Sequence, residues 1–185
     1  WLSASWALGA LLGLAYAARR LDHNGEPTKL MRGGLIVGLV AFPAVIFSAP
    51  LGSALLFFIG ALLIGFGAGL FSVATLILAM TIPISGIAGR GLAIGAWGAA
   101  QATAAGISIA LGGFLRDFIN YHAMRGSWGE ALATPATGYS FVYHSEIALL
   151  IVTLLVLTPL IRQGQRVASK TDQGSAGVRL ADFPM

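Results

Sequence analysis

The sequence predicts an all-α integral membrane protein, and three observations carry this prediction. Hydrophobic residues make up 57% of the 185 residues and charged residues only 10%, whereas soluble domains carry about 25% charged residues. The mean hydropathy is +0.83. No Lys, Arg, Asp or Glu occurs in the 57 residues from Gly33 to Gly89, and a membrane-spanning helix needs only about 20 apolar residues.

Five apolar segments are expected to form five transmembrane helices of one bundle. The first segment ends at Arg19 and Arg20, which begin a polar loop. A short turn at residues 50–53 separates the second and third segments, so these neighbours are expected to be antiparallel. Proline and glycine between residues 83 and 89 end the third segment. The expected spans are residues 1–18, 33–49, 54–80, 91–115 and 141–161.

Polar stretches lie on both sides of the fifth expected span. Arg116 and Asp117 are expected to close the fourth helix, and His122 is expected to be solvated in the polar loop that follows. Residues 163–185 contain few large apolar side chains, which predicts a disordered polar tail. Because Trp1 already lies in an apolar run with no start methionine before it, the chain is expected to be incomplete at its N-terminus.

The distribution of basic residues predicts the orientation in the membrane. If the five helices alternate in direction, nine of the eleven Lys and Arg residues fall on one side. Basic loops stay in the cytoplasm, so we expect a multi-pass protein whose residues 19–32 and C-terminus are cytoplasmic. The net charge of +4 therefore reflects topology and a lipid partner, and nucleic acid is not an expected partner.

Glycines four residues apart recur inside the apolar segments. Small residues at this spacing form a groove in which a second helix backbone approaches closely. The pattern predicts a tightly packed bundle. The candidate helix-packing residues are Gly9, Gly13, Gly34, Gly38, Gly65, Gly69, Gly91, Gly95 and Gly106.

Two polar side chains, Gln101 and Thr103, lie near the middle of the fourth segment. Polar side chains at this depth avoid lipid, because their hydrogen bonds would go unmet there. Gln101 shares a helix face with Trp97, four residues earlier. Two interpretations stay open: an interhelical hydrogen bond, or a cavity wall that contacts a ligand.

His144 and Glu146 make the start of the fifth segment its most polar part. They are two residues apart and do not share a helix face, whereas Tyr143 and Glu146 do. A neutral imidazole is a ligand for a metal or for the magnesium of a chlorin. His144 is therefore a candidate pigment ligand, an interfacial hydrogen-bonded histidine, or part of a structural His–Glu contact across helices.

The residues contain no pattern that indicates an enzyme. There is no cysteine, and no catalytic triad, pair of catalytic carboxylates, phosphate-binding loop or metal-ligand spacing stands out. Glu146 is the only acidic residue within an expected span. Ion-coupled transporters place ionisable groups at mid-membrane, so its isolation disfavours proton-coupled transport by this part of a chain.

Four stretches carry a family pattern. They are GLAIGAWGAAQATAAGISIALGGFLRD, ALLIGFGAGLFSVATLILAM, PATGYSFVYHSEIALL and IFSAPLGSALLF, at residues 91–117, 61–80, 135–150 and 46–57. These stretches resemble the PucC/LhaA family, also called the bacteriochlorophyll-delivery family, which is a branch of the major facilitator superfamily. With the loop lengths, the resemblance covers most of residues 1–162.

The resemblance implies both a fold and a function. Major facilitators are built from two halves of six helices, so five helices that end in the cytoplasm would correspond to the eighth to twelfth. The implied function is non-enzymatic assembly of light-harvesting complexes in the bacterial inner (intracytoplasmic photosynthetic) membrane, by handling bacteriochlorophyll, guiding antenna polypeptides, or both. The implied partners are antenna polypeptides or a photosynthetic reaction-centre complex, and bacteriochlorophyll is the implied cofactor.

Two other functions compete with this interpretation. One is secondary transport of a small amphipathic solute by a major-facilitator protein. The other is a structural membrane subunit packed against a photosynthetic complex.

Overall fold

The computed structural model describes residues 2–23, 25–81, 87–126 and 128–176. In this part of the chain it shows five α-helices and one short 3-10 helix, η1. They are α1 (Leu2–Asp22), α2 (Pro27–Ser48), α3 (Ala54–Met80), α4 (Ile87–Met124), η1 (Glu130–Leu132) and α5 (Ala136–Ala176). The chain divides into two compact parts, Trp1–Leu150 and Ile151–Met185. The described residues of the second part are the remainder of α5, with Pro159 inside the helix.

Local signals in the sequence set the helix ends. Pro27 begins α2, where its fixed φ suits a helix and its missing N–H is not needed. Gly52 adopts a φ of 58° in the turn between α2 and α3, a conformation that glycine adopts without steric cost. Ser53 then caps α3, because its hydroxyl accepts a hydrogen bond of 3.3 Å from the Leu56 N–H.

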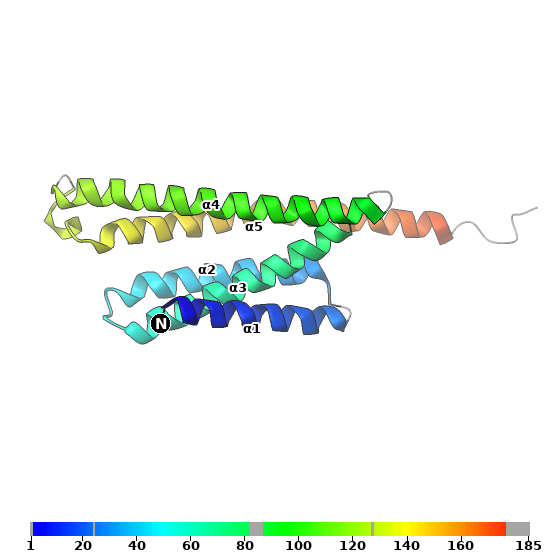
Figure 1. Ribbon diagram of the computed structural model, residues 1–185, viewed down its shortest axis with the longest axis horizontal. Helices are drawn as coiled ribbons and strands as arrows, with labels where there is room; N and C mark the ends of the chain where they lie inside the picture. Colours follow the sequence, from blue (N-terminus) through cyan, green and yellow to red (C-terminus); the bar gives the residue numbers. More distant parts are fainter. Residues whose placement is uncertain (1, 24, 82–86, 127, 177–185) are drawn as a thin grey trace, which may run out of the picture. The chain divides into compact units, whose positions relative to one another are not determined.

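Helix α3 lies between α1 and α2 and packs against both (Figure 1). Its contact with α1 is made backbone to backbone through two glycines on each helix. A Cβ added to Gly69 would lie 2.5 Å from the Ala10 carbonyl oxygen, and one added to Gly65, Gly9 or Gly13 would collide with the carbonyl oxygen opposite it. All four glycines are buried. The packing predicted from the glycine spacing thus corresponds here to an observed close approach.

The contact between α2 and α3 follows the same principle. Gly34 and Gly67 face each other, since a Cβ on either would lie 2.6 to 2.7 Å from the carbonyl oxygen of the other. Gly38 is buried under the side chain of Leu150 from α5, whose Cδ1 atom would lie 3.2 Å from an added Cβ. Small residues therefore bring three helices together along α3.

Among the described residues, one side-chain hydrogen bond links helix α4 to α3, and it lies in the first third of α4. The indole Nε1–H of Trp97 donates to the hydroxyl of Thr75 on α3 at 3.2 Å. The hydroxyl of Thr75 in turn donates to the Phe71 carbonyl oxygen at 2.9 Å. The polar atoms of both side chains are thereby satisfied within the membrane-spanning region.

Breaking the Trp97 bond is expected to destabilise the protein slightly. Interhelical hydrogen bonds in membranes contribute about 0.6 kcal/mol on average, so Trp97→Phe and Thr75→Val should each cost about that much. The double variant should cost little more than either single variant. Thermal unfolding in detergent would measure this, with Thr103→Val as the control because Thr103 is exposed. Equal losses in all three single variants would contradict the assignment.

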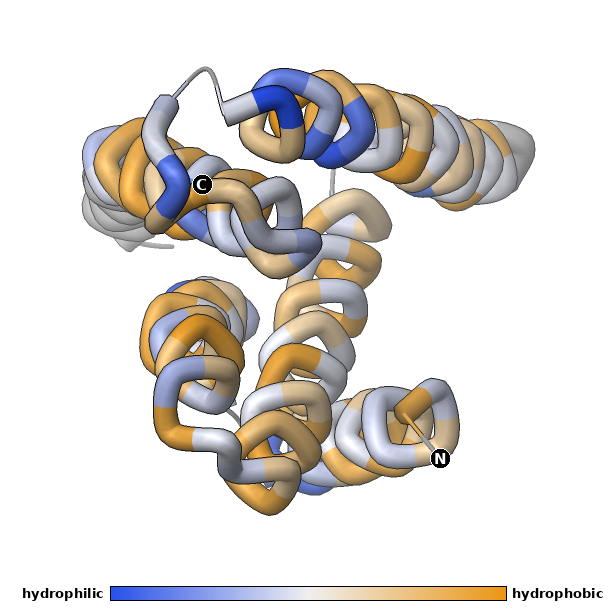
Figure 2. The backbone as a smooth tube through the Cα atoms, turned by 90° about the vertical axis from the view of Figure 1, so that its left-hand side faces the viewer, coloured by the Kyte–Doolittle hydropathy of each residue, from blue (hydrophilic) through white to orange (hydrophobic). Residues whose placement is uncertain are grey.

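The all-α membrane fold is confirmed, with one difference in the number of spans. Among the described residues, four helices are long and apolar enough to cross a membrane: α2, α3, the part of α4 from Gly91, and α5 as far as Pro159. Figure 2 shows the hydrophobic residues distributed along these helices. Helix α1, whose described residues begin at Leu2, is not among them, and the expected span at residues 1–18 stays a prediction. The correspondence with the eighth to twelfth helices of a major facilitator stays a prediction.

Two expected helix ends were wrong. Helix α4 does not close at Arg116 and Asp117 but continues for two more turns to Met124. The added turns bury Ile119 and Ala123 on one face, which stabilises the continued helix. Helix α5 begins at Ala136 and continues to Ala176, so the expected disorder is absent from residues 163–176. The tail residues 177–185 lie outside the described part of the chain.

Candidate functional site

A large groove opens at one end of the first part of the chain. It has a volume of about 1190 Å³. Its walls come from the first turns of α1 and α3, the end of α2, the end of α4, η1 and the first turns of α5. According to the distribution of basic residues, this is the end expected to face away from the cytoplasm. The ends of five helices thus contribute to one site.

The lining is apolar, with aromatic rings and a few hydroxyl groups. Among the described residues, no Lys, Arg, Asp or Glu lines the groove. Its aromatic residues are Phe47, Phe57, Trp128, Tyr139, Phe141 and Tyr143. A concave site with apolar walls and few polar groups is typical of binding sites for organic molecules.

A smaller hollow of about 410 Å³ adjoins the groove. The two share Leu2, Val45, Phe57 and Tyr143 as lining residues. The smaller hollow continues along α1 and α3 past Trp6 and Ile64. Its walls are almost wholly apolar, so the combined site has a wide part that contains polar groups and a narrower apolar extension.

His144 is the one lining residue that ordinarily binds metals. Its Nδ1 atom lies 2.7 Å from the carbonyl oxygen of Ser140, one turn earlier. Since a carbonyl oxygen only accepts, Nδ1 carries the proton and donates it. In the neutral ring Nε2 then has a free lone pair. Within the described residues no partner contacts Nε2, and the side chain is exposed.

Most other polar groups of the groove already have partners. The Ser48 hydroxyl donates to the Val45 carbonyl oxygen at 2.6 Å, and the Thr137 hydroxyl donates to the Leu132 carbonyl oxygen at 2.7 Å. The Tyr139 hydroxyl accepts from Arg116 at 2.8 Å. In the described part of the chain, the hydroxyl of Tyr143, the indole Nε1–H of Trp128 and Nε2 of His144 are left for a ligand.

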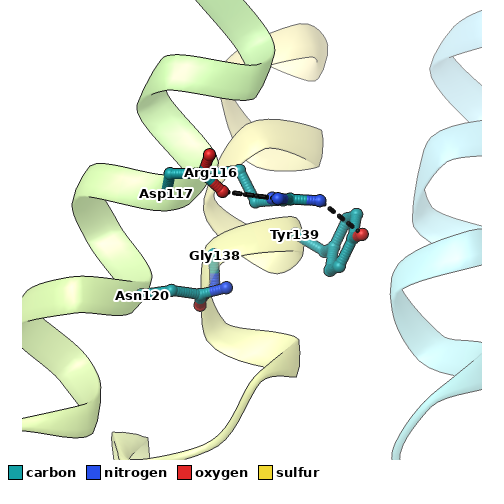
Figure 3. A network of polar contacts seen from close by, with 5 residues as sticks. All are labelled: Arg116, Asp117, Asn120, Gly138 and Tyr139. Carbon is teal, nitrogen blue, oxygen red and sulfur yellow. Dashed lines mark hydrogen bonds and ion pairs between the residues drawn. The ribbon is translucent and has the colours of Figure 1, made fainter.

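A polar clamp between α4 and α5 fixes the wall that carries His144 (Figure 3). The guanidinium of Arg116 donates to the Tyr139 hydroxyl and, from Nε at 2.8 Å, to Asp117. The Asn120 side-chain oxygen accepts from the Gly138 N–H at 2.8 Å. That N–H belongs to the first turn of α5, where backbone donors have no partner inside the helix. Asn120 therefore caps α5 from the neighbouring helix.

His122 does not lie in a solvated loop, as expected from the sequence, but in the last turn of α4. Its ring centroid is 4.7 Å from that of Phe118, 5.3 Å from that of Tyr121 and 6.0 Å from that of Trp128. Aromatic clusters of this kind are typical of the membrane–water interface. The cluster marks the end of α4 as interfacial and places Trp128 beside the groove.

The other candidate residues lie away from the groove. Trp97 is held by Thr75. Gln101 is half-buried and Thr103 exposed, and neither has a side-chain hydrogen bond among the described residues. Glu146 is half-buried and likewise has no ion pair in that part of the chain. In the described residues His144 contacts Ser140 of its own helix, and the His–Glu contact across helices stays a prediction.

Three of the candidate glycines, all on α4, have no packing partner in the described residues. An added Cβ at Gly91, Gly95 or Gly106 would have no atom within 4 Å. The partner that their spacing predicts is therefore not supplied by the described part of this chain.

The sequence alone missed the residues that shape the groove around His144. Tyr143 on α5 and Phe42 on α2 lie with their rings tilted by 42° and their centroids 6.0 Å apart, and Asn120 and Gly138 set the start of α5. The exposed aromatic residues of the 128–143 region were the available signal. Their convergence with the starts of α1 and α3 depends on tertiary packing.

These features define a multi-pass α-helical membrane protein with a large apolar groove at one end of its helices. A model of the family described as PUCC protein matches residues 1–165. The chain belongs to the PUCC protein family. No solved structure matches the chain.

Three curated relatives are similar to this chain. An uncharacterized protein in the puhA–bchM intergenic region of Rhodobacter capsulatus is 48% identical over 184 residues, which is 100% of this chain and 38% of that protein. Protein PucC of Rhodovulum sulfidophilum is 48% identical over 118 residues, 64% of this chain and 26% of that protein. Protein PucC of Rhodobacter capsulatus is 38% identical over 168 residues, 89% of this chain and 34% of that protein. The chain thus spans between 26% and 38% of the length of these relatives.

Proposed function

We propose that the protein is a non-enzymatic assembly factor for bacterial light-harvesting complexes. It handles bacteriochlorophyll, guides antenna polypeptides, or does both, in the inner photosynthetic membrane with its C-terminus in the cytoplasm. Its partners are antenna polypeptides or a photosynthetic reaction-centre complex. Membership of the PUCC protein family supports this proposal, together with the resemblance in the sequence.

The groove is the observation that carries the proposal. Its volume of about 1190 Å³ lies above the usual range of roughly 300–1,000 Å³ for small-molecule sites. The lining has no charged side chain, which disfavours a polar metabolite. A large amphiphile with a hydrocarbon chain fits the groove and its apolar extension better than a small solute does.

The surface of α4 supports a role in guiding membrane helices. Ile109 is 77% exposed, Phe114 69% and Leu111 61%. Five glycines of this helix would have no described atom within 4 Å of an added Cβ: Gly91, Gly95, Gly98, Gly106 and Gly113. Small residues permit close approach of another helix backbone. A small antenna polypeptide with one membrane helix is a partner of suitable shape.

The proposed function is tested by a substitution that fills the groove of the protein in a photosynthetic bacterium. Ala131 lines the groove, so we expect Ala131→Trp to lower the near-infrared absorbance of the antenna several-fold relative to wild type at equal protein level. Ala148→Trp is the control, because Ala148 is exposed on α5 and does not line the groove. Normal antenna absorbance in the Ala131→Trp strain, or in a strain without the gene, would reject the proposed function.

A further inference from the structure

The donor set of the groove restricts the kind of metal that it can hold. His144 is the only imidazole among the lining residues, and no Asp, Glu or Cys joins it. In the described part of the chain, no three His, Cys, Asp or Glu residues form a group suited to a metal ion. A free divalent ion needs several protein ligands. A single imidazole is enough only when a larger organic ligand already coordinates the metal and leaves one coordination position open.

The imidazole of His144 already has the tautomer and orientation that one bond from Nε2 to a metal requires. The hydrogen bond from Nδ1 to the Ser140 carbonyl oxygen, at 2.7 Å, fixes the tautomer and orients the ring. Metal-binding histidines ordinarily donate their other ring N–H to a carbonyl or carboxylate oxygen in this way. The lone pair of Nε2 is therefore available, and no described residue contacts it.

The walls of the site match a flat, apolar molecule that carries a chain. Aromatic side chains line the groove on the α2, α3 and α5 sides, and aromatic rings favour stacked or edge contacts with a planar π system. The adjoining hollow of about 410 Å³ extends along α1 past Trp6. It offers an apolar space for a hydrocarbon chain. Tyr143 lines both hollows, and its hydroxyl, which has no hydrogen-bond partner among the described residues, can donate to a carbonyl group of the ligand.

We propose that the groove binds a metallated tetrapyrrole with a hydrocarbon chain, that Nε2 of His144 is the axial ligand of its metal, and that the chain occupies the adjoining hollow. This inference rests on the proposed function and adds to it the site, the ligand atom and the direction in which the pigment lies.

Binding of two pigments that differ only in the metal tests the inference. The purified chain in lipid nanodiscs is titrated with bacteriochlorophyll and with its magnesium-free form, and absorption spectra follow binding. We expect the wild-type protein to bind the magnesium form about tenfold more tightly or better, the change that one modest contact produces. His144→Ala should remove this preference, and resonance Raman bands that report the coordination number of magnesium should lose the imidazole-bound form.

Three variants distinguish ligation from loss of fold. His122→Ala removes the other histidine of the α4–α5 hairpin, which does not line the groove, and should keep the preference. Tyr143→Phe should weaken both pigments alike. Added imidazole should restore the magnesium preference of His144→Ala. Equal affinity of the wild-type protein for the two pigments, absence of binding of both, or a preference that survives His144→Ala would each overturn the inference.

The strain carrying His144→Ala separates this inference from the proposed function. Loss of the magnesium preference in nanodiscs together with reduced antenna absorbance supports both. A preference unaffected by His144→Ala, in a protein whose Ala131→Trp variant still lowers antenna absorbance, overturns the axial ligand and leaves the assembly function in place.

Discussion

Gly65→Leu is expected to prevent stable packing of α1 on α3. The added Cβ would collide with the carbonyl oxygen of Trp6 and lie 2.9 Å from the backbone nitrogen of Ala10. Both obstacles are backbone atoms, so no side-chain rotation removes them, and the helices must separate. Overpacking of this kind typically costs about 1–3 kcal/mol and occasionally more. We expect a markedly lower unfolding temperature and lower yield of folded protein in mild detergent.

The matched control is Gly95→Leu on α4. Nothing lies within 4 Å of a Cβ at Gly95, and leucine favours a helix over glycine by roughly 0.5–1 kcal/mol. Its unfolding temperature should equal or exceed that of wild type. If the two variants were equally unstable, the α1–α3 contact would not be the reason for the effect.

Gly138→Leu is expected to open the clamp between α4 and α5. A Cβ at this position would lie 2.6 Å from the Arg116 carbonyl oxygen and 2.6 Å from the Asn120 side-chain oxygen. The first turn of α5 must then move away from α4, and its N–H loses the Asn120 cap. We expect a loss of stability of about 1–3 kcal/mol and a loss of binding in the groove, because Tyr139 and His144 lie on the displaced turns.

Thermal unfolding and pigment titration measure the two effects in the same sample. Gly113→Leu is the control, since it adds the same side chain to the same hairpin where nothing lies within 4 Å. Unchanged stability of Gly138→Leu would show that the clamp has little influence on the start of α5.

The glycine pattern predicted part of the packing because the chemistry of close approach is local. Gly9, Gly13, Gly65 and Gly69 occur at the spacing that a helix crossing needs, and the structure pairs them. The glycines of α4 have the same spacing, but no described helix packs against them. Spacing reports that a face can be approached, whereas the identity of the approaching helix depends on the whole bundle.

The ends of α4 and α5 could not be read from composition. A charged pair at Arg116 and Asp117 is typical of a helix end at the interface, yet here Arg116 extends to Tyr139 on the next helix and the helix continues. The groove escaped prediction for a related reason. His144 was identified from its residue type, but its Ser140 contact and its aromatic neighbours follow from tertiary positions that the sequence does not display.

The contact between α1 and α3 has a consequence for how the protein enters the membrane. The main described contact of α1 is made with α3, which follows two helices later in the chain. The four glycines of this contact bring backbone against backbone, so the two helices can associate only after α3 itself has been made and inserted. Until then the glycine face of α1 has no partner among the described helices, and the insertion of α3 is the step that completes this contact.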